Sequence, residues 1–126
     1  MKVILATLAA LMSLSVATVA DERTAAHTNM VVARHYGAKD QHLAGLNRLR
    51  IVLTQFQASE HVPEALARIA EAYLALGAAS DAQTAAAVLD RKFPGSPWSA
   101  RAHAVLASAA LAPVEDERSW ISKAFR

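Results

Sequence analysis

The sequence predicts an all-α protein built from antiparallel helix hairpins. Alanine accounts for much of the 54% hydrophobic content, aromatic residues make up only 6%, and there are 4 glycines. With few runs of β-branched residues, this composition favours helix. Apolar residues also recur at spacings of three and four, which places them on one face of a helix. One helical pattern repeats after 37 residues, so we expect two stacked hairpins followed by a closing helix.

Residues 1–20 are interpreted as a signal peptide for export and not as part of the fold. Lys2 provides a positive start, and residues 3–19 are apolar with many small side chains. The small-x-small triplet Thr18-Val19-Ala20 predicts cleavage after Ala20, and Ser15-Val16-Ala17 is a second candidate. A membrane span needs about 20 apolar residues, and Asp21-Glu22-Arg23 end this run earlier. An uncleaved N-terminal anchor stays the rival interpretation.

The chain contains no cysteine, so we expect neither disulfides nor a lipid attached to a cysteine. An exported chain without cysteine is compatible with the bacterial periplasm. We expect residues 21–112 to form the folded domain.

The first hairpin is predicted from about Thr24 to Gln55. Its first helix runs from Thr24, as the cap, to about Gly37, and its second covers residues 41–55, with the turn at 37–40. The inward-facing residues expected here are Tyr36, Gly45, Leu49, Val52 and Leu53.

The second hairpin is predicted between Val62 and Pro97. Pro63 suits a first helical turn, Gly77 suits a left-handed C-terminal cap, and Ser80 suits an N-cap. Phe93-Pro94-Gly95 end the second helix of the pair. The residues expected to pack the repeat are Leu66, Ala70, Tyr73, Ala82, Ala86, Leu89 and Pro94.

The two hairpins match residue by residue at an interval of 37. The matching pairs are Tyr36 with Tyr73, Gly45 with Ala82, Leu49 with Ala86, and Val52 with Leu89. This alternation of large and small residues resembles a tetratricopeptide repeat, whose period is normally about 34. The extra residues fall in the connection 58–62, so we expect a short tetratricopeptide-like solenoid of about two repeats plus a capping helix.

The C-terminal part is predicted as a capping helix over residues 98–111, ended by Pro113, and then a polar linker and amphipathic tail over residues 113–126. In the tail, Trp120, Ile121 and Phe125 can share one side of a short helix. The tail either folds back on the core or docks a partner.

No pattern for catalysis, a cofactor or a metal site is found. The five histidines include no pair at the i, i+4 spacing of a helical metal site. We expect a solvated face to carry Glu60, Glu64 and Glu71. No pattern in the sequence pairs them as a catalytic acid and base. A net charge of +2 gives no large basic field for nucleic acid. We therefore expect a protein that is not an enzyme and needs no cofactor.

Five motifs carry a family resemblance, at residues 34–36, 43–48, 61–66, 71–77 and 93–98. Together they resemble the BamD (ComL) family of tetratricopeptide lipoproteins, which serve outer-membrane β-barrel assembly. The resemblance covers roughly residues 25–111, the family's last two repeats. It implies a non-catalytic scaffold at the periplasmic face of the outer membrane, which docks the POTRA domain of BamA through Asn47 and Arg48.

The sequence departs from the family pattern in three ways. It lacks the lipid-carrying cysteine and the first three repeats, and Asp40 stands where the family usually has a turn glycine. Unfolded outer-membrane proteins remain a second candidate partner. Because no earlier repeat covers the first hairpin, self-association is a third expectation. The alternative functions are an exported chaperone-like peptide-binding module and a truncated, non-functional BamD fragment.

Overall fold

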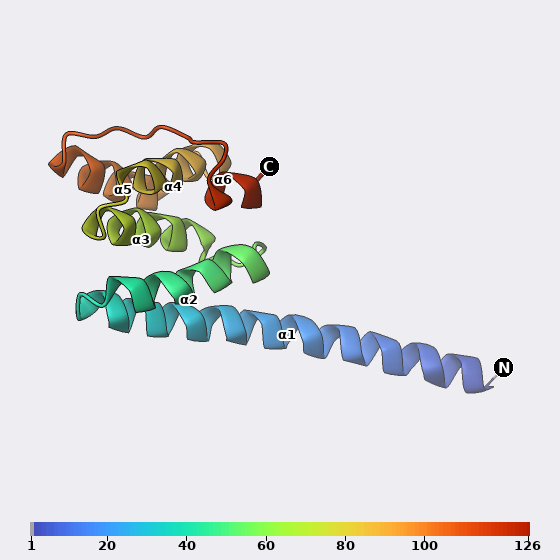
Figure 1. Ribbon diagram of the computed structural model, residues 1–126. Coiled ribbons are helices and arrows are strands. Elements are labelled where there is room, and N and C mark those ends of the chain that lie inside the picture. Colours follow the sequence, from blue (N-terminus) through green and yellow to red (C-terminus); the bar gives the residue numbers. More distant parts are fainter. Residues whose placement is uncertain (1) are drawn as a thin grey trace.

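A computed structural model describes the backbone of residues 2–126 and the side chains of residues 18–126. Within this part the chain forms six helices and no strand, which confirms the all-α prediction. The helices are α1 Lys2–Ala38, α2 His42–Gln55, α3 Val62–Ala75, α4 Ala79–Lys92, α5 Pro97–Ser108 and α6 Trp120–Ala124. The hairpin of α1 and α2 stacks on the hairpin of α3 and α4, and α5 with α6 closes the far end (Figure 1). The architecture is a short tetratricopeptide-like solenoid.

The turns that follow α1, α3 and α5 share one backbone geometry. Asp40, Gly77 and Ala110 are left-handed, with φ of 56°, 81° and 57°. In each turn the next N–H donates to a carbonyl five residues earlier, as from Ala78 to Tyr73 at 2.8 Å. These bonds satisfy carbonyls that the helix end leaves free. In the first turn Asp40, and not Gly37, therefore takes the position of the usual glycine.

Three predicted helix ends were wrong. The first helix does not begin at Thr24, because α1 continues through it and the Thr24 hydroxyl donates to the Ala20 carbonyl at 3.0 Å. No glycine or proline interrupts the sequence from Lys2 to Tyr36. Ser80 does not cap α4, which begins one residue earlier at Ala79. Helix α5 ends at Ser108, before the expected end at residue 111.

Helix α3 lies at the centre of the fold and contacts α2, α4 and α5. Most of its residues are buried, which is typical of a helix surrounded by others. The buried residues among those expected to pack the repeats are Gly45, Leu49, Leu66, Ala70, Ala82, Ala86 and Leu89. Tyr36 and Tyr73 are half-buried, whereas Gly77 and Pro94 lie exposed in turns.

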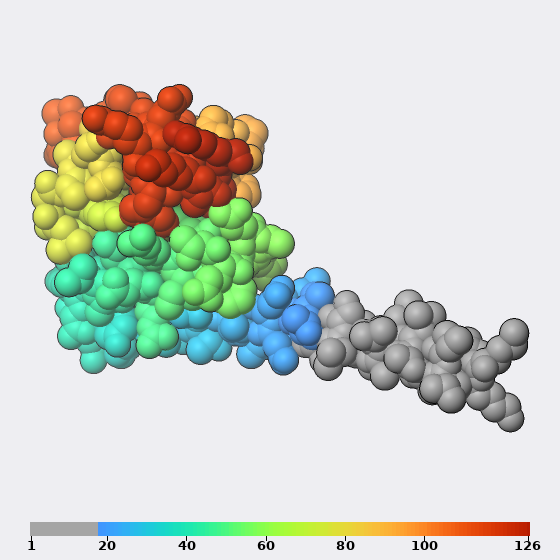
Figure 2. All heavy atoms as spheres, turned by 45° about the vertical axis from the view of Figure 1, so that its right-hand side comes forward, coloured from blue at the N-terminus to red at the C-terminus, as the bar shows by residue number. Residues whose placement is uncertain are grey.

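The C-terminal tail folds back over the second hairpin (Figure 2). Ile121 and Phe125 belong to the core. The indole N–H of Trp120 donates to the Tyr73 hydroxyl at 2.7 Å. The polar segment before it also contacts the second hairpin, because the buried Thr84 hydroxyl accepts from the Asp116 N–H at 2.9 Å. The tail is therefore a structural part of the stack.

Among the described residues, none of the helices combines the length and the apolar character that a membrane crossing requires. The expected signal peptide falls mostly on residues 1–17, whose side chains lie outside the described residues.

Candidate protein-docking surfaces

The outer face of α2 is the first candidate surface, and we call it the α2 face: Leu43, Asn47 and Arg48. The side chain of Leu43 is 63% exposed. Asn47 lies one turn further along the same side of the helix, and both Asn47 and Arg48 are exposed. An exposed leucine beside an arginine is a combination that suits a protein interface.

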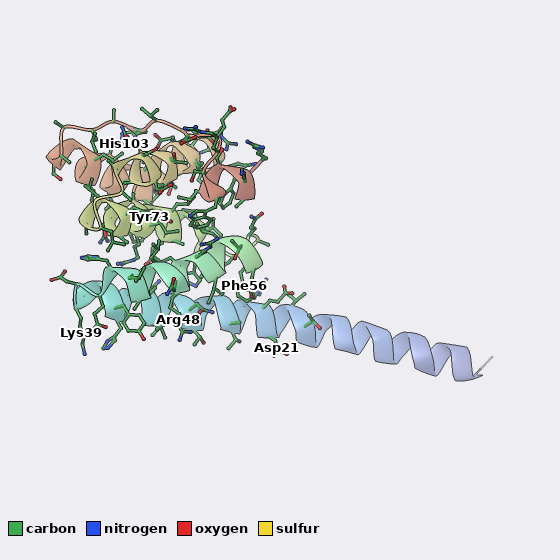
Figure 3. The ribbon with its side chains drawn as sticks, viewed as in Figure 1. Asp21, Lys39, Arg48, Phe56, Tyr73 and His103 are labelled. Carbon is green, nitrogen blue, oxygen red and sulfur yellow. The ribbon has the colours of Figure 1, made fainter. Side chains whose placement is uncertain are left out.

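Neighbouring polar residues of the first hairpin are already engaged. The guanidinium carbon of Arg50 lies 4.7 Å from the centre of the Trp120 ring, and the Gln57 amide donates to the Ala124 carbonyl at 2.6 Å. Arg48 instead makes one long hydrogen bond, 3.4 Å to the Asn29 side chain, among the described residues. It lies at the opposite end of the stack from His103 (Figure 3). Both arginines of α2 are exposed, but Arg50 is stacked on an aromatic ring, whereas no such stacking is found for Arg48 among the described residues.

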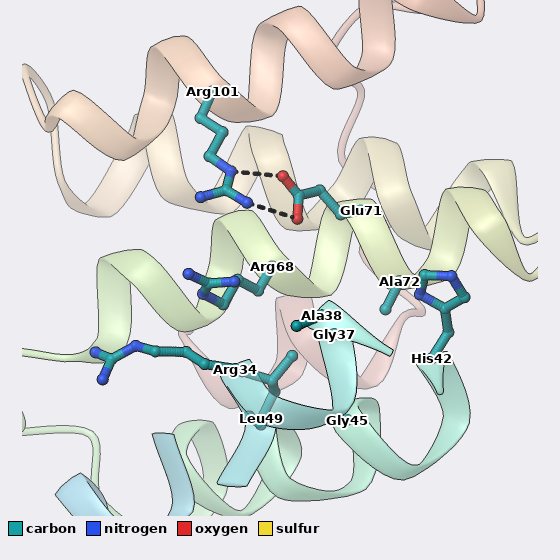
Figure 4. Close-up of a pocket in the computed structure, with 11 residues that line it drawn as sticks. Arg34, Gly37, Ala38, His42, Gly45, Leu49, Arg68, Glu71, Ala72 and Arg101 are labelled. Atoms are coloured by element: carbon teal, nitrogen blue, oxygen red, sulfur yellow. Dashed lines mark hydrogen bonds and ion pairs between the residues drawn. The ribbon is translucent and has the colours of Figure 1, made fainter. Parts of the chain in front are cut away.

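A groove between α1, α2, α3 and α5 is the second candidate surface, with a volume of about 370 Å³. Arg34, Arg68 and Arg101 line it, one from each of α1, α3 and α5, together with Glu71 (Figure 4). His42 of α2 lines it as well, and the other lining residues are small or apolar: Ala33, Gly37, Ala38, Gly45, Leu49 and Ala72.

Glu64 holds two of these arginines from beneath. Its carboxylate is 6% exposed and accepts two hydrogen bonds of 2.7 Å from Arg34 and one of 2.7 Å from Arg68. Burial raises the pKa of Glu64, but the hydrogen bonds and charges of the two arginines outweigh burial and lower this pKa to about 2. The pair of α1 and α3 is therefore joined by a buried, ionised carboxylate.

The other end of the groove has a second ion pair beside an aromatic ring. Arg101 donates to both oxygens of Glu71, at 2.6 Å and 3.1 Å. The guanidinium carbons of Arg68 and Arg101 lie 5.7 Å and 5.5 Å from the centre of the Trp98 ring, within cation–π range. The ring thus holds two arginines at one rim of the groove.

Nothing in the described part of the chain gathers three or more metal-ligating side chains. His27 and His61 do meet, with ring nitrogens 3.4 Å apart, although they lie 34 residues apart in sequence. Local spacing could not predict this contact, because the two histidines come from segments far apart in sequence.

The arginine groove was missed at the sequence level. The expectation that Glu64 lies on a solvated face was wrong, because Glu64 is buried and pairs with the side chains of Arg34 and Arg68. A signal was present: Arg34 and Glu71, which both line the groove, stand 37 residues apart and so occupy equivalent positions of the two hairpins. Equivalent positions in stacked repeats face the same side, so this spacing indicates one shared surface.

The stacked hairpins define a helical-repeat protein, and the α2 face and the groove lie on its surface. The profile of the family YfiO, described as outer membrane lipoprotein, matches residues 16–89. The chain belongs to this family.

Two curated relatives carry the name outer membrane protein assembly factor BamD. The one from Caulobacter vibrioides is 38% identical over 84 residues, which is 67% of this chain and 28% of the relative. The one from Rickettsia prowazekii is 35% identical over 69 residues, 55% of this chain and 28% of the relative. The chain thus spans little more than a quarter of the length of these relatives. No solved structure gives a significant match.

Proposed function

We propose that the chain is a non-catalytic interaction scaffold of outer-membrane protein assembly and works at the periplasmic face of the outer membrane. Its partner in this proposal is the POTRA domain of BamA, by resemblance to the family. The two relatives named outer membrane protein assembly factor BamD support the role in outer-membrane protein assembly.

The α2 face is the proposed docking site. The observation that carries this assignment is the contrast between the two exposed arginines of α2: Arg50 is stacked on Trp120, whereas Arg48 makes one long hydrogen bond. Arginine is favoured in interfaces and, when central, often contributes strongly to affinity. Asn47 and the exposed Leu43 extend the face along the helix.

A binding titration of the full chain against the BamA POTRA domains tests the proposal. Arg48→Glu reverses a charge at the α2 face and should weaken binding at least tenfold. Lys92→Glu makes the same charge change at the exposed end of α4 and should leave binding unchanged. Equal effects of the two variants would reject the α2 face as the docking site.

We propose that residues 1–20 act as a signal peptide for export and are cleaved after Ala20. Mass determination of the chain recovered from a periplasmic extract tests it. A mature N-terminus at Asp21 supports the route, and an intact Met1 in a membrane-bound chain would favour the uncleaved anchor.

A further inference from the structure

We propose that the groove between α1, α2, α3 and α5 binds an acidic peptide segment. Its carboxylates are held by Arg34, Arg68 and Arg101. This site is separate from the α2 face and does not depend on the proposed docking there. It would give the chain a second partner, recognised by negative charge.

The first support is the balance of charge in the groove. Three arginines and His42 line it, and Glu71 is the one acidic residue among the lining residues. Glu64 lies buried beneath and is shared by Arg34 and Arg68. The groove therefore keeps an excess of positive charge, which an acidic segment complements.

The second support is the set of hydrogen-bond donors that remain. Within the described residues, the hydrogen bonds of Arg68 use only its Nε. Arg34 and Arg101 each use Nε and one terminal nitrogen. A guanidinium has five N–H donors in a planar fork. Donors of all three arginines are thus left for a further carboxylate, a group that Arg binds with matched geometry.

The third support is the shape of the groove. Its volume of about 370 Å³ lies in the range of roughly 300–1,000 Å³ typical of ligand sites. Glycines and alanines leave room for a main chain to approach closely, and Trp98 fixes two of the arginines at the rim. An extended peptide fits these features better than nucleic acid, because a peptide can place a neutral residue opposite the Glu71 carboxylate, whereas nucleic acid carries a phosphate at every nucleotide.

Fluorescence anisotropy with labelled probes tests the inference on the full chain. The probes are a ten-residue peptide of alternating Glu and Ala and a matched peptide of alternating Gln and Ala. We expect the Glu peptide to bind at least tenfold more tightly, and its affinity to fall as salt increases. Equal binding of both peptides, or no binding of the Glu peptide at millimolar concentration, would overturn the proposal. Tighter binding of a single-stranded oligonucleotide would overturn it as well.

Substitutions at Ala38 locate the binding without disturbing the ion pairs. Ala38 is exposed and lines the groove. Ala38→Glu should weaken Glu-peptide binding at least fivefold, and Ala38→Lys should strengthen it, whereas Arg48→Gln on the other surface should not change it. Arg101→Gln should also weaken binding about tenfold, with folding checked by circular dichroism. If Ala38→Glu and Ala38→Lys act alike, the groove is not the site.

Discussion

The ion pairs of Glu64 contribute to the stability of the fold and also hold two arginines of the groove. The Glu64 carboxylate joins α1 to α3 through Arg34 and also binds Arg68. The pKa of Glu64 falls from 4.5 to about 2, and each unit corresponds to about 1.4 kcal/mol, so the ionised carboxylate contributes about 3 kcal/mol to folding. Glu64→Gln should therefore lower the free energy of unfolding by about 2–3 kcal/mol at pH 7, since both arginines lose their counter-charge.

The pH dependence of this loss follows from the direction of the shift. Because the pKa in the folded state lies below the unfolded value, the contribution is complete above about pH 4.5 and disappears as the pH falls towards 2. Between pH 7 and pH 3 the contribution of the ionised carboxylate falls by about 2 kcal/mol, so the stability difference between the unmodified chain and Glu64→Gln should shrink to about 1 kcal/mol or less.

Urea denaturation followed by far-UV circular dichroism at pH 7 and pH 3 measures both quantities. Glu71→Gln is the matched control, because the Arg101–Glu71 pair is more open, with side chains 42% and 27% exposed. It should cost less than about 1 kcal/mol. A loss below about 1 kcal/mol for Glu64→Gln at pH 7, or a loss that does not shrink at pH 3, would refute the buried-carboxylate account.

Three further changes test the turns, the close helix contact and the tail. Ala110→Gly should raise the free energy of unfolding by about 0.5–1 kcal/mol, because glycine adopts the left-handed φ of 57° without strain; an unchanged thermal midpoint would contradict this. Gly45→Ala should also stabilise, by about 0.5–1 kcal/mol, because a new Cβ would meet Tyr36 Cβ at an ordinary 3.5 Å; a lower urea midpoint would show that the helices lie closer. Trp120→Phe keeps an aromatic ring but removes the hydrogen bond to Tyr73. It should lower the free energy of unfolding by about 1 kcal/mol and speed hydrogen exchange in residues 113–126. Unaltered exchange would mean that this hydrogen bond does not hold the tail.

The repeat architecture could be predicted from the sequence because its signals are local. The small residue at position 45 and its match at 82, and the turn glycine at 77, are visible without any knowledge of tertiary contacts. The turn at Asp40 was harder to assign, since Gly37 offered a rival position. Only the backbone shows that Asp40 takes the left-handed conformation.

The groove could not be predicted from local sequence, because its charged residues come from three different helices. The i, i+4 pair of Glu64 and Arg68 is visible in the sequence, but Arg34 lies 30 residues from Glu64 and meets it only through stacking. Burial of Glu64 depends on this same stacking, so its helix face could not be assigned from local pattern.

The tail was ambiguous for a different reason. An amphipathic segment with Trp120 and Phe125 can cover its own core or a partner's groove with similar local sequence. The outcome depends on whether the core offers a place for it, and here Tyr73 and Thr84 provide hydrogen-bond partners for the tail.

Size-exclusion chromatography with light scattering, on the full chain with and without BamA POTRA domains, tests the scaffold role most directly. We predict a complex of defined mass that is lost in Arg48→Glu and kept in Lys92→Glu. A stable dimer of the chain that ignores the POTRA domains would contradict docking through the α2 face and would assign the exposed surface of the first hairpin to self-association.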